Sequence, residues 1–407
     1  MNFTSFKYIV FIVLLYLFVY NPPFQGLPVS PVEIMIIPAV LYIIISWKWY
    51  STIKIFKVET FLFFLIIFFS YLRDFERSES VFFKANVLLF LESIVIPSAL
   101  LIFYSKLKNG GNLFKEIVFV GGIAAFITFF LIFVPPLNLF VKNVLLQQNE
   151  FSEFIAFRSF GLSEGLTFAF GVVQGLVFAF AFYFSRTKSK YLILLPFLLL
   201  SIFFNARSGL IPVVFILVYF VILKFNFKFI GVSFLIGFLF YLILFQTPFF
   251  KEYAQTLEWA FDFFVQTSDF FTGKADNADV NTFSTLFGDM VVLPQNLTEW
   301  LIGSGDNVFL FKTGNSDVGY IIQLNYGGVI YLFLIVLLIS HLILRLKFLN
   351  RNHRWFVLML LFTIVIGNVK GLFISVNANF RLIMLMYCYL IFEYRKGINH
   401  INSLFVA

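Results

Sequence analysis

Four cationic residues stand at the ends of apolar segments, where their side chains can reach an anion. They are Arg158 in FRSFGLSEG, Arg207 in FNARSGL, and Lys370 and Arg381 in NVKGLFISVNANFRL. Around Arg207, short polar residues and a glycine predict a turn at a helix start, where free backbone N–H groups and a guanidinium suit a phosphate or pyrophosphate. The alternative, contact with phospholipid headgroups, stays open for each of the four.

A glycine-rich stretch late in the chain is the second place where we expect ligand chemistry. Gly303 and Gly305 allow a sharp turn with exposed N–H donors. Ser316 and Asp317 then precede an apolar segment that starts at Val318 and includes Tyr320, and this pattern predicts a helix N-cap. Irregular polar backbone at the mouth of an apolar segment is where membrane proteins commonly place their function.

Carboxylates supply the remaining candidates. Glu164 and Asp317 are candidate general bases toward a hydroxyl group. Glu92 and Gln174 fall near the middle of apolar segments, where a polar side chain is either functional or held by hydrogen bonds inside the protein. No cluster of Cys, His or carboxylate residues has metal-ligand spacing, so we expect neither a metal nor a cofactor.

The composition requires a membrane to hold these residues. The chain is 61% hydrophobic and 12% charged, about half the charge of soluble proteins. Apolar runs of this length favour helices over barrel strands, so we predict an all-α, polytopic integral membrane protein. We expect about twelve transmembrane helices: 3–20, 28–47, 55–72, 81–104, 114–134, 162–185, 190–205, 209–226, 229–247, 318–344, 355–372 and 376–394.

Charge asymmetry orients these spans. With twelve helices, 18 of the 29 basic residues fall in short connections on one side, which the positive-inside rule makes cytoplasmic. Both termini are then cytoplasmic. The excess of eight positive charges reflects this distribution, and we expect no nucleic-acid partner. We predict a single membrane domain, 1–407, with a large extracytoplasmic loop, 248–317, that carries ten acidic residues.

Within that loop, residues 251–271 mix charged and aromatic side chains and predict an interfacial helix, and 273–279 predicts a turn. A second helix is expected over 280–293. The only cysteine, Cys388, lies in the last apolar span and is expected to pack there without a redox role.

The order of these features resembles bacterial O-antigen and capsule polymerases of the Wzy type and, more loosely, the O-antigen ligases. The motifs that carry the resemblance are Arg158-Ser159-Phe160-Gly161 through Glu164, Ala206-Arg207-Ser208-Gly209, and Gly303-Ser304-Gly305 followed by Ser316-Asp317-Val318-Gly319-Tyr320 and Gly327-Gly328. Each motif is short, whereas the resemblance in architecture covers nearly the whole chain.

The resemblance implies a metal-independent glycosyltransferase with a GT-C-like architecture in the bacterial cytoplasmic (inner) membrane. Such an enzyme polymerises undecaprenyl-pyrophosphate-linked repeat units into O-antigen, capsule or exopolysaccharide on the outer face. Arg158 and Arg207 match outer-loop arginines that hold the lipid-linked sugars in the family. With Asp317 and Glu164 they form the expected catalytic set. The expected substrate-binding residues are Lys370, Arg381, Gly303, Gly305, Ser316 and Tyr320.

The expected partners are the lipid-linked glycans and the bilayer, with a flippase and a chain-length regulator beside them. An O-antigen ligase is an alternative, but no histidine lies between 248 and 317 to act as its base. A flippase or other transporter of lipid-linked oligosaccharides is a second alternative. A cell-wall glycosyltransferase of the shape-and-division type is a third, and a sensor or scaffold remains compatible with the topology.

Overall fold

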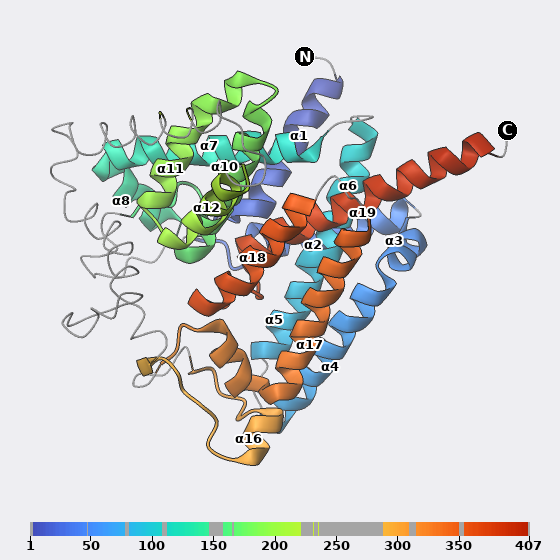
Figure 1. Ribbon diagram of the computed structural model, residues 1–407, viewed down its shortest axis with the longest axis vertical. Coiled ribbons are helices and arrows are strands. Elements are labelled where there is room, and N and C mark those ends of the chain that lie inside the picture. The colour runs from blue at the N-terminus through green and yellow to red at the C-terminus, as the bar shows by residue number, and fades with distance from the viewer. Residues whose placement is uncertain are drawn as a thin grey trace. The chain divides into compact units, whose positions relative to one another are not determined.

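A computed structural model describes residues 3–46, 48–77, 81–107, 112–145, 158–164, 167–220, 231, 235, 288–308, 315–349 and 354–405 (Figure 1). These residues are all-helical, and no strand occurs among them. They form two compact units, each of which we describe by itself. Unit 1 comprises residues 1–19, 29–113 and 290–407, and unit 2 comprises residues 20–28 and 114–289.

Unit 1 contains the long helices of the chain. In order they are α1 (Phe3–Tyr20), α2 (Pro31–Ile45), α3 (Trp49–Ile55), α4 (Lys57–Arg77), α5 (Val81–Phe90), the π-helical segment η1 (Leu91–Val95), α6 (Ile96–Leu107), α16 (Leu297–Ile302), α17 (Gly319–Leu349), α18 (Arg354–Lys370) and α19 (Ala378–Phe405). Ser30 begins α2 with a capping box, because its hydroxyl accepts from the Glu33 N–H while the Glu33 carboxylate accepts from the Ser30 N–H.

Unit 2 is built around α10 (Thr167–Ser185). Its other helices are α7 (Leu113–Phe133), α8 (Pro135–Val144), η2 (Ser189–Ile193), α11 (Leu194–Phe203), η3 (Arg207–Gly209) and α12 (Leu210–Val218). α10 packs against α11, η3 and α12. The approach is close because Gly171 and Gly175 of α10 face the backbone at Ala206 and Gly209, where a Cβ on either glycine would clash. This contact fixes the polar turn that carries Arg207.

Four helical stretches among the described residues are long and apolar enough to cross a membrane, and they make this a membrane-embedded protein. They are Phe82–Leu107, Leu113–Phe133, Phe168–Ser185 and Gly319–Lys347. A fifth is obtained if α2 and α3, which meet at 104°, count as one span. Each of the four coincides with a predicted span. Shorter apolar helices lie at other predicted positions, and the span predicted at 229–247 lies largely outside the described residues, so twelve spans stay a prediction.

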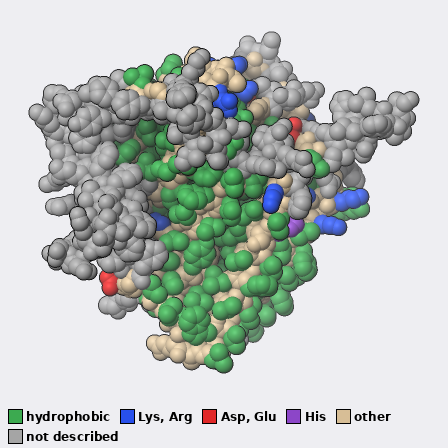
Figure 2. Space-filling model, in the orientation of Figure 1, with side chains coloured by type: hydrophobic (Ala, Val, Ile, Leu, Met, Phe, Trp, Pro, Cys, Tyr) green, Lys and Arg blue, Asp and Glu red, His purple; other side chains and the backbone are tan. Residues whose placement is uncertain are grey.

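The helices α4 and α17 of unit 1 lie side by side and antiparallel. At one end, the Tyr326 hydroxyl donates to the Asp74 carboxylate over 3.1 Å. At the other end, Arg345 donates to Glu59. Between these polar ends, both helices present apolar side chains to the surface, and Figure 2 shows hydrophobic atoms over this face.

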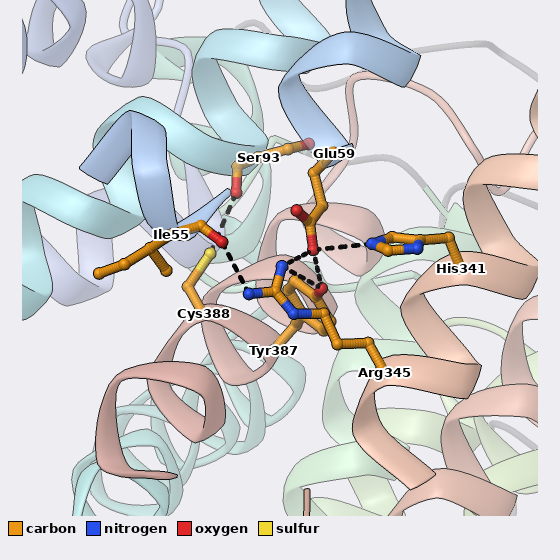
Figure 3. Close-up of polar contacts among 7 residues, drawn as sticks. All are labelled: Ile55, Glu59, Ser93, His341, Arg345, Tyr387 and Cys388. Atoms are coloured by element: carbon orange, nitrogen blue, oxygen red, sulfur yellow. Dashed lines mark hydrogen bonds and ion pairs between the residues drawn. The ribbon is translucent and has the colours of Figure 1, made fainter. Parts of the chain in front are cut away.

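The polar end near Glu59 ties α4, α17 and α19 together (Figure 3). One carboxylate oxygen of Glu59, which is fully buried, accepts from the Arg345 guanidinium and the Tyr387 hydroxyl, and His341 Nε2 lies 3.2 Å from it. Arg345 also donates to the Ile55 carbonyl over 2.7 Å. These contacts pair the buried negative charge of Glu59, which would otherwise be costly. Because the partners come from different helices, the cluster also fixes α4, α17 and α19 relative to one another.

α17 is broken at Gly328, whose φ of 64° and ψ of −165° lie outside helical geometry. The break frees carbonyl groups in the preceding turn. The Asn325 carbonyl accepts from the Ser304 N–H over 2.7 Å, and the Tyr326 carbonyl accepts from the Gly305 N–H over 3.1 Å. The Gly303–Gly305 turn therefore caps the first part of α17 from outside.

The predicted loop 248–317 is described only in part. The interfacial helix expected at 251–271, the turn expected at 273–279 and most of the helix expected at 280–293 lie outside the described residues. The described portion, 288–308 and 315–317, belongs almost entirely to unit 1 and contains α16 and the turn that caps α17.

Candidate functional site

The structure divides the predicted site residues between the two units. Arg158, Glu164 and Arg207 belong to unit 2. The residues that belong to unit 1 are Gly303, Gly305, Ser316, Asp317, Tyr320, Lys370 and Arg381. The two sets are therefore described separately.

In unit 2, two of the three motifs that carry the family resemblance meet. The side-chain amide of Asn205 donates to the Ser159 carbonyl over 2.7 Å and to the Ser201 carbonyl over 2.6 Å. Asn205 is fully buried, and Ser159 follows Arg158 directly. The segment that contains Arg158 thus lies against the turn that leads into Arg207, although 46 positions separate the bonded residues. The backbone of Arg207 is described, and its side chain is not.

A second asparagine holds the same segment from α8. The side-chain amide of Asn138 donates to the Arg158 carbonyl over 3.2 Å. Lys142 lies one helical turn beyond Asn138 on α8, on the same face, and only 4% of its surface is exposed. Arg158 is half-buried. The two cations are thereby brought to the same part of unit 2.

Burial and mutual repulsion shape the charge of this pair. Burial, followed by the nearby charge of Arg158, lowers the pKa of Lys142 from 10.5 to about 8. Burial also lowers the pKa of the Arg158 guanidinium, which starts from a far higher value and so stays charged at neutral pH. An anion bound beside both would relieve the repulsion and favour protonated Lys142. A group with two or more negative charges matches this arrangement best.

Three neutral acceptors belong to the residues that form or hold the Arg158 segment. Asn138 Oδ1, Ser159 Oγ and Asn205 Oδ1 are buried and accept no hydrogen bond from the described residues. Buried polar atoms are nearly always satisfied, so a hydroxyl group or a water molecule would complete these three. We call Asn138, Lys142, Arg158, Ser159 and Asn205 the unit 2 polar site.

Sequence patterns do not single out Lys142, because it lies between the predicted spans 114–134 and 162–185. The structure shows that Pro135 and Pro136 begin a helix, α8, and a helix brings Asn138 and Lys142 onto one face. The signal was present in the sequence, since proline is favoured in the first turn of a helix.

Glu164 lies at the end of the same segment. Its carboxylate accepts from the Asn21 side-chain amide over 3.3 Å, and its N–H donates to the Tyr20 carbonyl over 2.9 Å. The carboxylate is half-buried. Gln174, also singled out from the sequence, is fully buried and donates to the Tyr20 hydroxyl over 3.1 Å. Gln174 thus takes part in a hydrogen bond inside the protein.

In unit 1, Arg381 lies in the first turn of α19, at a helix start as we expected, but its side chain points into the protein. It is 1% exposed and donates to the Glu92 carboxylate over 3.1 Å. Glu92 lies in η1, and π-helical turns inside α-helices are frequent at functional sites. This ion pair gives both residues a role inside the protein. A role of Arg381 in binding substrate stays a prediction.

The expectation of exposed N–H donors at Gly303 and Gly305 is also wrong. The Gly303 N–H donates to the Glu299 carbonyl over 2.8 Å, and the Gly305 N–H caps α17. The Gly303 carbonyl accepts from Arg73 over 2.9 Å. The turn is sharp as predicted, with φ of 77° and 78° at its two glycines, but its donors are used within the protein.

The start of α17 and the end of α18 bring together the remaining residues of unit 1. The Tyr320 hydroxyl donates to the Val365 carbonyl over 3.1 Å. Ser316 is buried, its hydroxyl accepts from the Val318 N–H over 3.2 Å, and Asp317 beside it is half-exposed. Lys370, the last residue of α18, is exposed. The predicted N-cap is displaced, because α17 starts at Gly319 and Ser316 closes a local turn before it.

No family model, no curated protein and no solved structure matches this chain. The assignment of a function therefore depends on the residues themselves. Within the described part of the chain, no three His, Cys, Asp or Glu side chains lie close enough together to hold a metal ion. The unit 2 polar site has cationic and amide side chains, which suit an anion.

Proposed function

We propose that this protein lengthens a polysaccharide by transferring the chain from undecaprenyl pyrophosphate to a lipid-linked repeat unit. The single observation that carries the proposal is the unit 2 polar site, where Asn205 joins the Arg158 segment to the turn of Arg207 and Lys142 adds a buried cation. A diphosphate in this position would meet several positive charges in a setting of low dielectric constant.

The reaction needs such charges at one point. The bond between the anomeric carbon of the growing chain and the pyrophosphate oxygen breaks, and both electrons leave with the pyrophosphate. A hydroxyl oxygen at the non-reducing end of the acceptor forms the new bond to that carbon. Arg158, Arg207 and Lys142 stabilise the negative charge that develops on the leaving group, an electrostatic effect that is often the largest in catalysis.

The proton of the acceptor hydroxyl needs a base. Glu164 is our first candidate, because its half-buried carboxylate ends the segment that starts at Arg158. Asp317, which is half-exposed at the start of α17, is the second candidate. Replacement of the true base by its amide should lower the rate of chain growth and leave binding of the lipid-linked donor unchanged.

The proposal includes a membrane topology. About twelve helices in a GT-C-like arrangement would cross the bacterial inner membrane, with both termini cytoplasmic and the Arg158 and Arg207 segments outside. A flippase would supply the lipid-linked units and a chain-length regulator would set the polymer size. Reporter fusions after residues 164 and 209 test the orientation. Cytosolic activity of both reporters would contradict the proposal.

Proteoliposomes supplied with lipid-linked repeat units test the chemistry. Wild-type protein should produce a ladder of polymer. Arg158→Ala and Arg207→Ala should abolish the ladder at normal protein level and leave single repeat units intact. Lys188→Ala removes an exposed cation of unit 2 outside the site and should leave the ladder unchanged. Normal polymer in Arg158→Ala would remove this residue from the mechanism.

A flippase for the same lipid-linked units is the second candidate, and unit 1 provides an observation in its favour. The pairs Glu92–Arg381 and Glu59–Arg345 place charge inside unit 1, where a transporter needs it. The same proteoliposomes distinguish the two functions. A flippase would move the lipid-linked units across the bilayer without chain growth, and a ligase would transfer finished chains to a different lipid acceptor.

A further inference from the structure

The short helix α16 exposes an apolar face. Leu297, Trp300 and Leu301 are 76%, 37% and 49% exposed, and Leu293 just before the helix is 50% exposed. The polar groups at the helix start are used among themselves, because Asn296 accepts from the Glu299 N–H over 2.9 Å and donates to the Glu299 carboxylate over 2.8 Å. A cluster of large apolar side chains on a surface marks a site of interaction.

Contacts with α17 and α4 fix the position of α16 along these two helices. α16 packs on α17, and the Leu301 backbone lies so close to Gly328 that a Cβ at Gly328 would clash with it. The turn that follows α16 is bonded to the end of α4 by Arg73, which donates to the Gly303 carbonyl over 2.9 Å. α16 therefore lies beside the break of α17 and the polar end of α4.

The position of α16 along α17 matches one boundary of a bilayer. The part of α17 after the break, Val329–Leu349, spans 21 residues, or roughly 32 Å, against about 30 Å for the hydrocarbon core. The antiparallel α4 has 21 residues, of which the uncharged part, 60–72, spans roughly 20 Å. Polar contacts of Arg73 and Asp74 bound this pair at the α16 end, and the Glu59–Arg345 contact bounds it at the other.

The surface between the two polar ends is apolar. Phe64 and Phe68 of α4 and Phe333 and Val336 of α17 are each at least half exposed. Figure 2 shows a continuous field of hydrophobic atoms on this face. α16 packs on α17, so its exposed apolar side chains lie next to this surface. A surface that faces lipid over the length of two helices thus extends onto α16, which favours lipid as the occupant over a protein partner.

We infer that α16 lies in the interface of the bilayer, with Leu297, Trp300 and Leu301 at the boundary between headgroups and acyl chains. Trp is enriched at this depth because its ring is apolar and its N–H is polar. The break at Gly328 then marks the membrane boundary of α17. The glycine turn at 303–305, which caps α17, lies at the same surface.

Tryptophan quenching tests this depth. Trp300 is kept while the other four tryptophans, Trp47, Trp49, Trp259 and Trp355, are changed to Phe. The protein is placed in phosphatidylcholine vesicles brominated either near the headgroup or near the chain ends. Trp300 should be quenched more strongly by the shallow bromines. A matched variant carries Phe68→Trp, in the middle of α4, together with Trp300→Phe, and should be quenched more strongly by the bromines near the chain ends.

Equal or no quenching of Trp300 in the two kinds of vesicle would overturn the inference. A second measurement does not need the tryptophan changes. In a Cys388→Ser background, Leu297→Cys and Thr298→Cys are compared for reaction with a water-soluble maleimide in vesicles. Leu297→Cys should react about tenfold more slowly than its exposed polar neighbour. Equal reaction rates for the two variants would contradict the inference. So would protection of Leu297→Cys that depends on the ratio of protein to lipid, because that dependence indicates contact with a second copy of the protein. Both readouts are independent of enzymatic activity, so they leave the proposed function untouched.

Discussion

The guanidinium of Arg381 lies 3.1 Å from the carboxylate of Glu92, and both side chains are almost completely buried between α19 and η1. Each residue was singled out from the sequence for a different reason, Arg381 as a cation for substrate and Glu92 as a carboxyl group within an apolar span. Their pairing explains why each charged residue is present within the protein. A charge inside a membrane protein is tolerated when an opposite charge is positioned against it.

Removal of one partner should destabilise the protein far more than removal of both. Arg381→Met leaves a buried carboxylate without its counter-charge and should lower the free energy of unfolding by about 3–5 kcal/mol. The double variant Glu92→Leu/Arg381→Met should recover most of this loss. Unfolding in detergent micelles measures both. If Arg381→Met kept wild-type stability yet made no polymer, Arg381 would bind substrate as first predicted.

The glycine at the break of α17 should tolerate no side chain. Gly328→Ala places a Cβ against the Leu301 backbone and also forces a positive φ, so we expect a loss of more than about 2 kcal/mol in stability. Gly26→Ala is the matched control, because Gly26 also has a positive φ but has open space around it. It should cost only about 1 kcal/mol. A similar loss for the two variants in thermal unfolding would argue against close packing at the break.

Asn205→Ala should separate the two motifs that meet in unit 2. It removes two buried hydrogen bonds, including the one to the Ser159 carbonyl, and should cost about 1–3 kcal/mol. Chain growth should fall more than stability does, because Arg158 and Arg207 are no longer held together. Ser185→Ala removes a bond of similar length to the Phe182 carbonyl elsewhere in unit 2 and should not affect polymer. Normal polymer in Asn205→Ala would show that the contact is not needed.

Lys142 should make the unit 2 polar site sensitive to pH. With its pKa lowered from 10.5 to about 8, the unfolded chain binds more protons than the folded protein between these values. The free energy of unfolding should therefore rise with pH across that window. Over the same window Lys142 loses its charge, so binding of a diphosphate should weaken above pH of about 8.

The control for this prediction is Lys142→Arg, which keeps its charge throughout. Titration of inorganic pyrophosphate onto the protein in nanodiscs should show the alkaline loss of affinity in the wild type and a flat profile in the variant. Identical profiles for the two proteins would mean that Lys142 does not contact the anion.

Sequence patterns were sufficient for the helical class and for the positions of the four long spans. Long apolar runs such as 81–104 leave no other solution in a bilayer, because a helix satisfies every backbone group by itself. The same patterns could not predict the π-helical segment at Glu92 or the break at Gly328. Both depend on contacts with distant segments, α19 in the first instance and the Gly303–Gly305 turn in the second.

The candidate site was predictable only in part for the same reason. Arg158 and Arg207 were chosen on local motifs, and the bond from Asn205 to Ser159 brings their segments together. Lys142 was missed because the apolar pattern shows only that it lies between two spans, and not that a helix forms there. The burial of Arg381 could not be predicted, because the sequence does not show which charges pair and Glu92 lies 289 positions away.

The measurement that tests the central claim most directly is the affinity of the purified protein in nanodiscs for undecaprenyl pyrophosphate. Wild-type protein and the Lys188→Ala control should bind equally. Arg158→Ala and Lys142→Ala should each bind at least about tenfold more weakly, since each removes a charged contact that is out of water. Unchanged affinity in a folded Lys142→Ala/Arg158→Ala double variant would contradict the account.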